Sequence, residues 1–313
     1  MADKKSIVVV GSINMDLVAS AAHIPAAGET ILGTGFETHP GGKGANQAVA
    51  VARLGFPVQM IGQVGSDDLG RQLREQLNRA GVETGAVGTA AGPSGVALIT
   101  VSAKGENSIV VVPGANSQVT PAWLDQHAAL IRGAGAVLAQ LEIPLETVLH
   151  LAELCAASHV PLILDPAPAR ALPAEVFPHI SWFTPNETEA AFYLGHAAGA
   201  QDYTTSAKEL QSRGVKGVIL KLGADGSYLA NASGIEARVS PFSVKAVDST
   251  AAGDAFNGAF ATALMMGKSA LESAIFASAA SAISVTRAGA QASMATLDEV
   301  LRMLGEGQAS PEK

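Results

Sequence analysis

VDSTAAGDAFNG, at residues 247–258, joins a turn of small residues to the start of an apolar helical pattern. The first N–H groups of a helix have no partner within it, and together with the helix dipole they attract anions such as phosphate. Ala251, Ala252 and Gly253 are small enough for phosphate oxygens to reach the backbone. Asp254 follows them as a carboxylate that can take a proton from an attacking hydroxyl. The stretch predicts a phosphoryl-transfer site, although the dipole alone also favours an acid in a first helical turn.

Short apolar runs that lead through a turn into a helical pattern recur along the chain, at residues 7–10, 58–64, 136–141 and 161–164. This alternation predicts an α/β fold with a doubly wound, mainly parallel sheet and helices on both faces. Ligands of such a sheet lie beyond the carboxyl ends of its strands. Because no repeat and no linker divides the 313 residues, we expect a single domain over residues 1–313.

Two insertions interrupt this alternation of strands and helices, because each contains short strands with no helix between them. They pair residues 17–19 with 29–38, and 82–89 with 96–102. We expect the insertions, at about 17–38 and 82–102, to form a small β-sheet that acts as a lid and keeps water from phosphoryl transfer. An ordinary edge hairpin is the alternative.

The predicted small sheet has apolar side chains that one subunit alone does not cover. They are Val18, Ile31, Leu98 and Ile99. Because an exposed apolar sheet invites pairing with a second copy, we expect a homodimer through the two lids.

Charge and cysteine content limit the partners and the compartment. Twenty basic and 28 acidic residues give a net charge of -8, which disfavours non-specific binding to nucleic acid and to anionic membranes. The single cysteine, Cys155, lies in an apolar helical pattern, so a disulfide framework is excluded. The apolar run near the N-terminus is too short for a signal sequence, and glycines and a proline interrupt the uncharged stretch 84–103. We expect a cytoplasmic protein without a membrane span.

A second glycine-rich loop, HPGGKGANQA at residues 39–48, also opens a helical pattern. It is not a Walker A motif, because Glu37 stands where that motif needs glycine and Gly44 follows the lysine. Lys43 and Asn46 lie about one helical turn apart, so both can reach a polyhydroxylated ligand. A turn with a helix cap is the alternative.

Asn14 and Asp16 follow the first strand at a spacing of two, which places them on one side of an extended segment. A carboxylate can accept hydrogen bonds from two neighbouring hydroxyls, and an amide both donates and accepts. This pair indicates sugar binding, or an Asx turn after a strand.

Five motifs then occur in a characteristic order: NMD at 14–16, GGKGAN at 41–46, NETE at 186–189, LGADG at 222–226 and AAGDAFNG at 251–258. With this set the chain resembles the ribokinase family of carbohydrate kinases over residues 6–304 or so. The resemblance implies a ribokinase-like fold and ATP-dependent transfer of the γ-phosphoryl group to a sugar. The expected acceptor is the C5 hydroxyl of D-ribose.

The resemblance also implies roles for individual residues. Asp254 is the expected base, and Ala251, Ala252 and Gly253 form the anion hole. The sugar contacts are Asn14, Asp16, Gly42, Lys43, Asn46, Glu142 and Asp254. The nucleotide contacts are Asn186, Lys221, Gly223, Ala224, Asp225, Gly226, Gly253 and Ser278.

Two positions depart from the family pattern: Lys221 replaces a threonine, and Ser278 stands where a histidine often meets the adenine.

Two metal ions are part of the same expectation. Glu189 is expected to organise Mg²⁺ through water, which suits an ion that prefers oxygen ligands, although NETE alone is only a helix start. K⁺ is expected beside the anion hole, where carbonyls, hydroxyls and one carboxylate suit it. Its residues are Asp248, Thr250, Ser284, Arg287, Gly289 and Ser293. None of the seven histidines pairs at a spacing of four, which disfavours zinc.

Other functions remain open at this point. A kinase for deoxyribose, for a sugar of the fructose type or for a nucleoside would share these motifs. A catalytically silent sugar- or nucleotide-binding regulator on the same fold is the alternative outside catalysis, but such a protein would be expected to lose Asp254.

Overall fold

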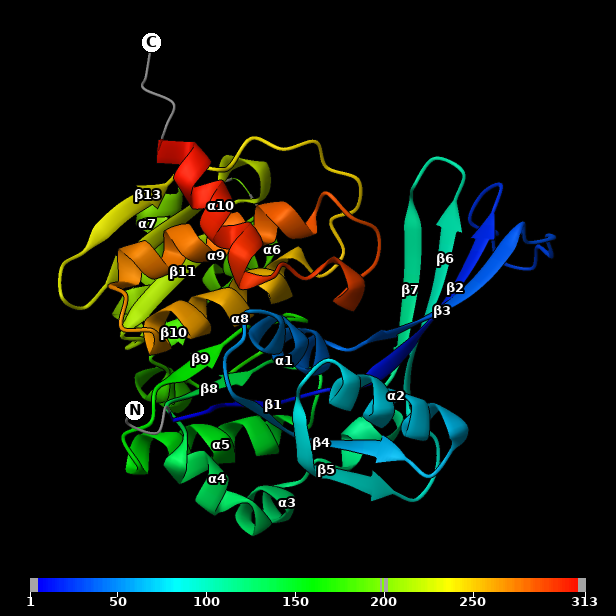
Figure 1. Cartoon of the computed structure of the whole chain (residues 1–313), viewed down its shortest axis with the longest axis horizontal. Coiled ribbons are helices and arrows are strands. Elements are labelled where there is room, and N and C mark those ends of the chain that lie inside the picture. Colours follow the sequence, from blue (N-terminus) through cyan, green and yellow to red (C-terminus); the bar gives the residue numbers. More distant parts are fainter. Residues whose placement is uncertain (1–4, 198, 200–201, 309–313) are drawn as a thin grey trace.

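The computed structural model describes residues 5–197, 199 and 202–308 (Figure 1). Within these residues, nine strands form a large sheet in the order β13-β12-β11-β10-β9-β8-β1-β4-β5. All neighbours from β11 to β5 pair in parallel, whereas β12 and β13 extend the sheet antiparallel at one edge. The strands are β1 (Ile7–Val10), β4 (Val58–Gly65), β5 (Glu83–Ala90), β8 (Ala136–Ala139), β9 (Leu162–Leu164), β10 (Trp182–Phe183), β11 (Gly217–Lys221), β12 (Ser227–Asn231) and β13 (Glu236–Val239).

Helices cover both faces of the large sheet, as the central strand β1 shows. Its four residues are fully buried, with Ile7 and Val9 in one apolar core and Val8 and Val10 in the other. The core of Val9 is closed by α1 (Lys43–Arg53), α2 (Asp68–Arg79), α8 (Ala252–Met265), α9 (Ala270–Ser284) and α10 (Leu297–Gln308). The core of Val8 is closed by α3 (Pro121–Gln126), α4 (Ala128–Gly133), α5 (Leu145–Ala157), α6 (Glu187–Leu194) and α7 (Tyr203–Ser212). The predicted doubly wound α/β fold is confirmed.

Short 3₁₀ turns complete the described elements: η1 (Gly114–Gln118), η2 (Ala174–His179), η3 (Gly223–Asp225) and η4 (Gln291–Ser293). No helix in the described part of the chain is long and apolar enough to cross a membrane.

A separate small sheet projects from one end of the large one (Figure 1). Its order is β3-β2-β6-β7, with β2 (Asn14–Ala21), β3 (Gly35–Gly41), β6 (Gly95–Ser102) and β7 (Asn107–Val112). The expected pairing of residues 82–89 with this sheet was wrong. Residues 83–89 lie in β5, which pairs with β4 because Ala86 and Val87 pack into the two opposite cores of the large sheet. The fourth strand of the small sheet is instead β7, which was not predicted from the sequence.

One face of the small sheet carries exposed apolar side chains. The register of the strands places Phe36, Leu98, Val110 and Val112 on the face opposite Asp16. All four side chains are at least 43% exposed. Of the residues expected on this surface, Leu98 belongs to it, whereas Val18 and Ile99 lie on the other face and Ile31 lies outside the strands.

Candidate active site

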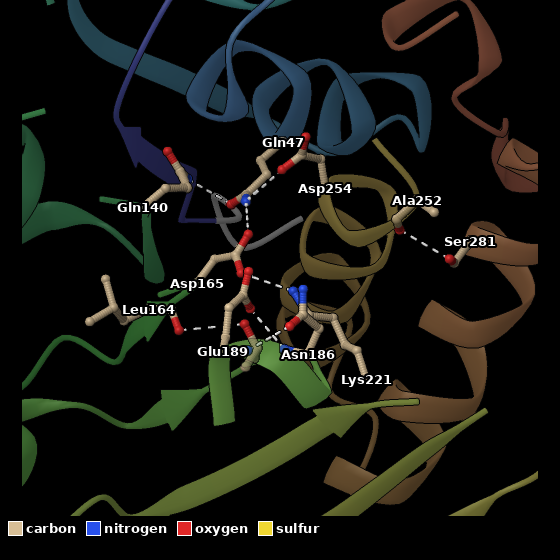
Figure 2. A network of polar contacts seen from close by, with 11 residues as sticks. Gln47, Gln140, Leu164, Asp165, Asn186, Glu189, Lys221, Ala252, Asp254 and Ser281 are labelled. Atoms are coloured by element: carbon tan, nitrogen blue, oxygen red, sulfur yellow. Dashed lines mark hydrogen bonds and ion pairs between the residues drawn. The ribbon is translucent and has the colours of Figure 1, made fainter. Parts of the chain in front are cut away.

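The carboxyl ends of the parallel strands and the starts of two helices meet at one edge of the large sheet (Figure 2). Ser12, Gln140 and Asp165 follow β1, β8 and β9, and Lys221 is the last residue of β11. All four residues are largely buried. The first turns of α1 and α8 face this edge, as expected for a ligand site in a doubly wound sheet.

Asp254 lies at the centre of this edge, in the first turn of α8, and is 4% exposed. Asn46 Nδ2 donates to its Oδ2 at 3.0 Å, and Gln47 Nε2 donates to its Oδ1 at 3.1 Å. Both amides come from α1, so the two helices fix the carboxylate between them. Burial raises the pKa of the Asp254 carboxyl, while the positive charge of Lys43 and the two amide hydrogen bonds lower it.

The start of α8 has the features of an anion site. Ala251, its N-cap, has φ 59°, in the left-handed region that few non-glycine residues adopt. No side chain caps this helix end, so the N–H groups of the first turn are not taken by a capping side chain. Ser281 Oγ of α9 donates to Ala252 O at 3.0 Å and thereby holds the turn in place.

The predicted sugar residues gather beside Asp254. Gly42 has φ 87°, and a Cβ there would lie 2.7 Å from the backbone nitrogen of Asn14, so only glycine fits. Asn14 Oδ1 accepts a hydrogen bond of 2.7 Å from Asn116. Glu142 Oε2 accepts from Ser12 Oγ at 2.5 Å and from the backbone nitrogen of Lys43 at 3.1 Å. The glycine loop, β1 and the end of β8 are therefore joined at this point.

The pKa values of two groups in the sugar region, Asp16 and Lys43, are both raised. Burial raises the pKa of the Asp16 carboxyl to about 6, and the negative charges of Glu142 and Asp254 add to the shift. Burial alone would lower the pKa of the Lys43 ammonium, but the carboxylates of Asp254, Asp165, Glu142 and Glu189 raise it above its usual range. Lys43 is therefore a firmly protonated donor.

The two polar atoms of the Asn46 side chain differ in their hydrogen bonding. Its nitrogen binds Asp254, whereas its Oδ1 is buried without a hydrogen-bond partner among the described residues. A buried polar atom without a partner is costly, and a ligand hydroxyl would satisfy it. The expected convergence of Lys43 and Asn46 on one polyhydroxylated ligand stays a prediction, to which this buried acceptor adds support.

Asn186 and Glu189 form a capping box at the start of α6. Glu189 N donates to Asn186 Oδ1, and Asn186 N donates to Glu189 Oε2, both at 2.8 Å. The helix-start interpretation is therefore correct for these atoms, but it does not account for the burial of Glu189 at 9% exposure. Burial raises the pKa of the Glu189 carboxyl, the charge of Lys221 lowers it and that of Asp165 raises it.

The other expected nucleotide residues lie on two elements. Gly223, Ala224 and Asp225 form the exposed turn η3, which one residue separates from the end of β11, and Leu222 N donates to Gly226 O at 2.9 Å to close it. Ser278 is buried in α9, one turn before the serine that binds Ala252.

Asp248 links the segment of the expected anion hole to the loop that follows α9. Its Oδ1 accepts from Thr250 N at 2.9 Å and from Thr250 Oγ1 at 2.6 Å, and its Oδ2 accepts from Gly289 N at 2.8 Å. Burial opposes ionisation of Asp248, but these hydrogen bonds lower its pKa below the usual value. Asp248, Thr250 and Gly289 are thus brought together.

The remaining residues of the expected cation site use their side chains elsewhere. The Arg287 side chain pairs with Glu299 at 2.5 Å, which leaves only its carbonyl for an ion. Ser284 Oγ donates to Ser281 O and Ser293 Oγ donates to Ala290 O, both at 2.8 Å. Across residues 5–197, 199 and 202–308, no three His, Cys, Asp or Glu side chains are grouped to hold a metal ion.

Three buried residues of the site were missed by the sequence analysis. Asp165 accepts from Gln47 Nε2 at 3.1 Å, and Gln140 Nε2 donates to Gln47 Oε1 at 2.7 Å (Figure 2). Asp165 and Gln140 are the first polar residues after buried strands, and Gln47 directly follows the motif GGKGAN. Position at the carboxyl end of a parallel strand was the signal that could have found the first two.

Comparison with known proteins agrees with this geometry. A model described as pfkB family carbohydrate kinase matches residues 4–297. The chain is 40% identical to the ribokinase of Haemophilus influenzae and 41% identical to that of Bacillus subtilis, in each case over 96% of this chain and 99% of the relative. The structure of Arabidopsis thaliana ribokinase complexed with ribose and ATP matches with a TM-score of 0.90 at 35% identity, over 96% of this chain and 98% of that one. The chain belongs to the pfkB family of carbohydrate kinases.

In this pfkB-family chain the resemblance and the ribokinase-like fold expected from the sequence are confirmed. The roles expected for single residues stay predictions, to which the geometry adds partners and distances.

Asp254→Asn should lower turnover by roughly 10²–10⁴-fold, because a positioned general base contributes about that much. The variant should also melt above the parent at pH 7, since a carboxyl whose pKa is raised in the folded state destabilises the fold when ionised. This gain in melting temperature should shrink as the pH falls and Asp254 of the parent becomes protonated. Asp68→Asn, at an exposed position of α2, is the control with the same charge change. Near-parental turnover of Asp254→Asn would exclude Asp254 as the base.

Proposed function

We propose that the enzyme transfers the γ-phosphoryl group of ATP to the C5 hydroxyl of D-ribose. The observation that carries this proposal is the buried Asp254, aligned by two amides at the uncapped start of α8 and flanked by the predicted sugar residues. The near full-length similarity of the chain to ribokinases, one of them solved with ribose and ATP, supports the choice of sugar and phosphoryl donor.

In this proposal Asp254 accepts the proton of the C5 hydroxyl as its oxygen attacks phosphorus. The bond from phosphorus to the ADP oxygen breaks, and the N–H groups at the start of α8 stabilise the charge on the transferring group. Asn14 and Asp16 bind the C2 and C3 hydroxyls, and Asn46 Oδ1 accepts from a further hydroxyl.

Mg²⁺ and K⁺ complete the proposal. In the described part of the site, Asp16, Glu142, Asp165, Glu189 and Asp254 face two lysines, Lys43 and Lys221. Because ATP brings more negative charge, a divalent cation is needed, and oxygen-preferring Mg²⁺ fits beside Glu189 through water. When bound, it neutralises charge on the nucleotide phosphates. Asp248, with the carbonyls of the 286–293 loop, would hold K⁺.

We also propose one domain over residues 1–313 in which the small sheet is a lid, and a homodimer formed through the lids. The exposed apolar face formed by Phe36, Leu98, Val110 and Val112 supports the dimer. In addition, β7 leaves one edge of the small sheet unpaired. A cytoplasmic location fits both the supply of ATP and the buried free thiol of Cys155, whose pKa burial raises to about 12.

Removal of the C2 hydroxyl from the substrate should cost about 1–3 kcal/mol in kcat/KM, because it leaves buried polar groups unpaired. The comparison of ribose with 2-deoxyribose at pH 8 measures this cost. The preference should weaken below pH of about 6, where Asp16 becomes protonated and loses acceptor capacity. Equal kcat/KM values at pH 8, or a preference for 2-deoxyribose, would contradict the assignment of ribose.

Light scattering of the parent at micromolar concentration should give the mass of a dimer. Leu98→Lys with Val110→Lys, a neighbouring pair on the exposed face, should give a monomer because charge then replaces apolar contact. Leu301→Lys, at a similarly exposed position of α10, is the control and should remain dimeric. A monomeric parent would exclude the lid-to-lid dimer.

Potassium should raise kcat, and sodium should do so only weakly, because the ion stiffens the backbone that binds the transferring phosphate. Asp248→Ala should remove the response to potassium while the requirement for magnesium persists. Rates are compared at matched ionic strength with a bulky organic cation. Equal rates of the parent in potassium and in the organic cation would rule out the site.

A further inference from the structure

Lys221 and Asp165 form a buried ion pair at the same sheet edge. Lys221 Nζ lies 2.8 Å from Asp165 Oδ1, and the side chains are 15% and 2% exposed. Two charges taken out of water cost several kcal/mol each, so a buried pair is weak evidence of a stabilising role. The position of the pair in the site indicates a role other than stabilising the fold.

The ammonium of Lys221 lies beside the expected anion hole. A Cβ placed on Gly253 would be 3.3 Å from Lys221 Nζ, so the ammonium lies close to the backbone of the first turn of α8. An ammonium has three N–H donors. Asp165 is the one hydrogen-bond partner of Nζ recorded among the described residues, which leaves donors for a ligand at the start of α8.

Asp165 also connects this ammonium to the base. Gln47 Nε2 donates both to Asp165 Oδ2 and to Asp254 Oδ1, at 3.1 Å each (Figure 2). Gln140 donates to Gln47 Oε1 and thereby sets the orientation of that amide. A continuous series of contacts, Asp254 to Gln47 to Asp165 to Lys221, therefore fixes the base and the ammonium relative to each other.

We propose that Lys221 is a catalytic residue that donates to a non-bridging oxygen of the transferring phosphoryl group, and that Asp165 is the positioning residue that aims it. The inference rests on the proposed phosphoryl transfer. Lys221 keeps its protons throughout: the sugar proton goes to Asp254, the new oxygen–phosphorus bond forms and the bond to ADP breaks. Because charge on the equatorial oxygens is what the ammonium stabilises, its contribution is largest in the transition state.

Lys221→Met, Asp165→Asn and the double variant test this proposal. Lys216→Met is the matched control, because Lys216 is exposed and precedes the opposite end of β11. Lys221→Met should lower kcat by about 10²–10³-fold, as for loss of one preorganised donor, with little change in KM for ATP. The double variant removes both charges, so it should melt closer to the parent than Lys221→Met and still be as slow.

Two further readouts separate catalysis from structure. Affinity for ADP with fluoroaluminate and sugar, which imitates the transferring group, should fall in Lys221→Met by about the factor lost in kcat, while affinity for ADP alone changes little. Asp165→Asn should lower kcat less than Lys221→Met does, since the ammonium remains but is held less firmly.

Either of two results would overturn the proposal. A double variant with kcat within about threefold of the parent would mean that Lys221 only neutralises Asp165. A rise in KM for ATP at unchanged kcat would make Lys221 a ground-state nucleotide contact. A parent that releases ADP with another sugar but not with ribose refutes only the substrate assignment, and the same variants are then compared with that sugar.

Discussion

The close contact between α1 and α8 is the constraint on which the site depends. A Cβ on Gly258 would lie 2.6 Å from Ala50 Cβ and 2.9 Å from Gln47 O, so glycine allows the two helices to approach this closely. At this separation the amides of Asn46 and Gln47 reach Asp254, which is 208 residues away from Asn46 in the sequence. The position of Asp254 is thus set by backbone packing, and the hydrogen bonds then select the orientation of its carboxylate.

Electrostatics add a second constraint, because the site gathers more carboxylates than ammonium groups away from water. Burial raises the pKa of both Asp16 and Asp254; the charges of Glu142 and Asp254 add to the rise for Asp16, and that of Asp165 adds to the rise for Asp254. Burial alone would lower the pKa of Lys43, but the charges of Asp254, Asp165, Glu142 and Glu189 raise it, so its ammonium offsets part of this negative charge. A site of this kind binds hydroxyls through acceptors and needs cations to receive a phosphate.

Local sequence patterns predicted the parts of the site that one short segment builds. Small residues at a helix start are enough to predict an anion hole, and a position just after a strand is enough to predict Asn14 and Asp16 as ligand contacts. Asp165 was missed because its partners, Lys221 and Gln47, are 56 and 118 residues away, and no local pattern reveals such pairing. The misplacement of residues 82–89 has a similar cause: an apolar alternation indicates a strand, but the sheet it joins depends on which cores cover its two faces.

The lysine at residue 221, where the resemblance implies a threonine, has a structural counterpart in this site. A lysine in place of a neutral threonine puts a positive charge at a largely buried strand end, which is tolerated only with a carboxylate within reach. Asp165, the residue after β9, supplies that carboxylate, with its Oδ1 2.8 Å from Lys221 Nζ. Since Asp165 also binds the amide that orients Asp254, the residue at position 221 and Asp254 belong to one hydrogen-bonded unit. Residue 221 is therefore linked to Asp254 through Asp165 and Gln47.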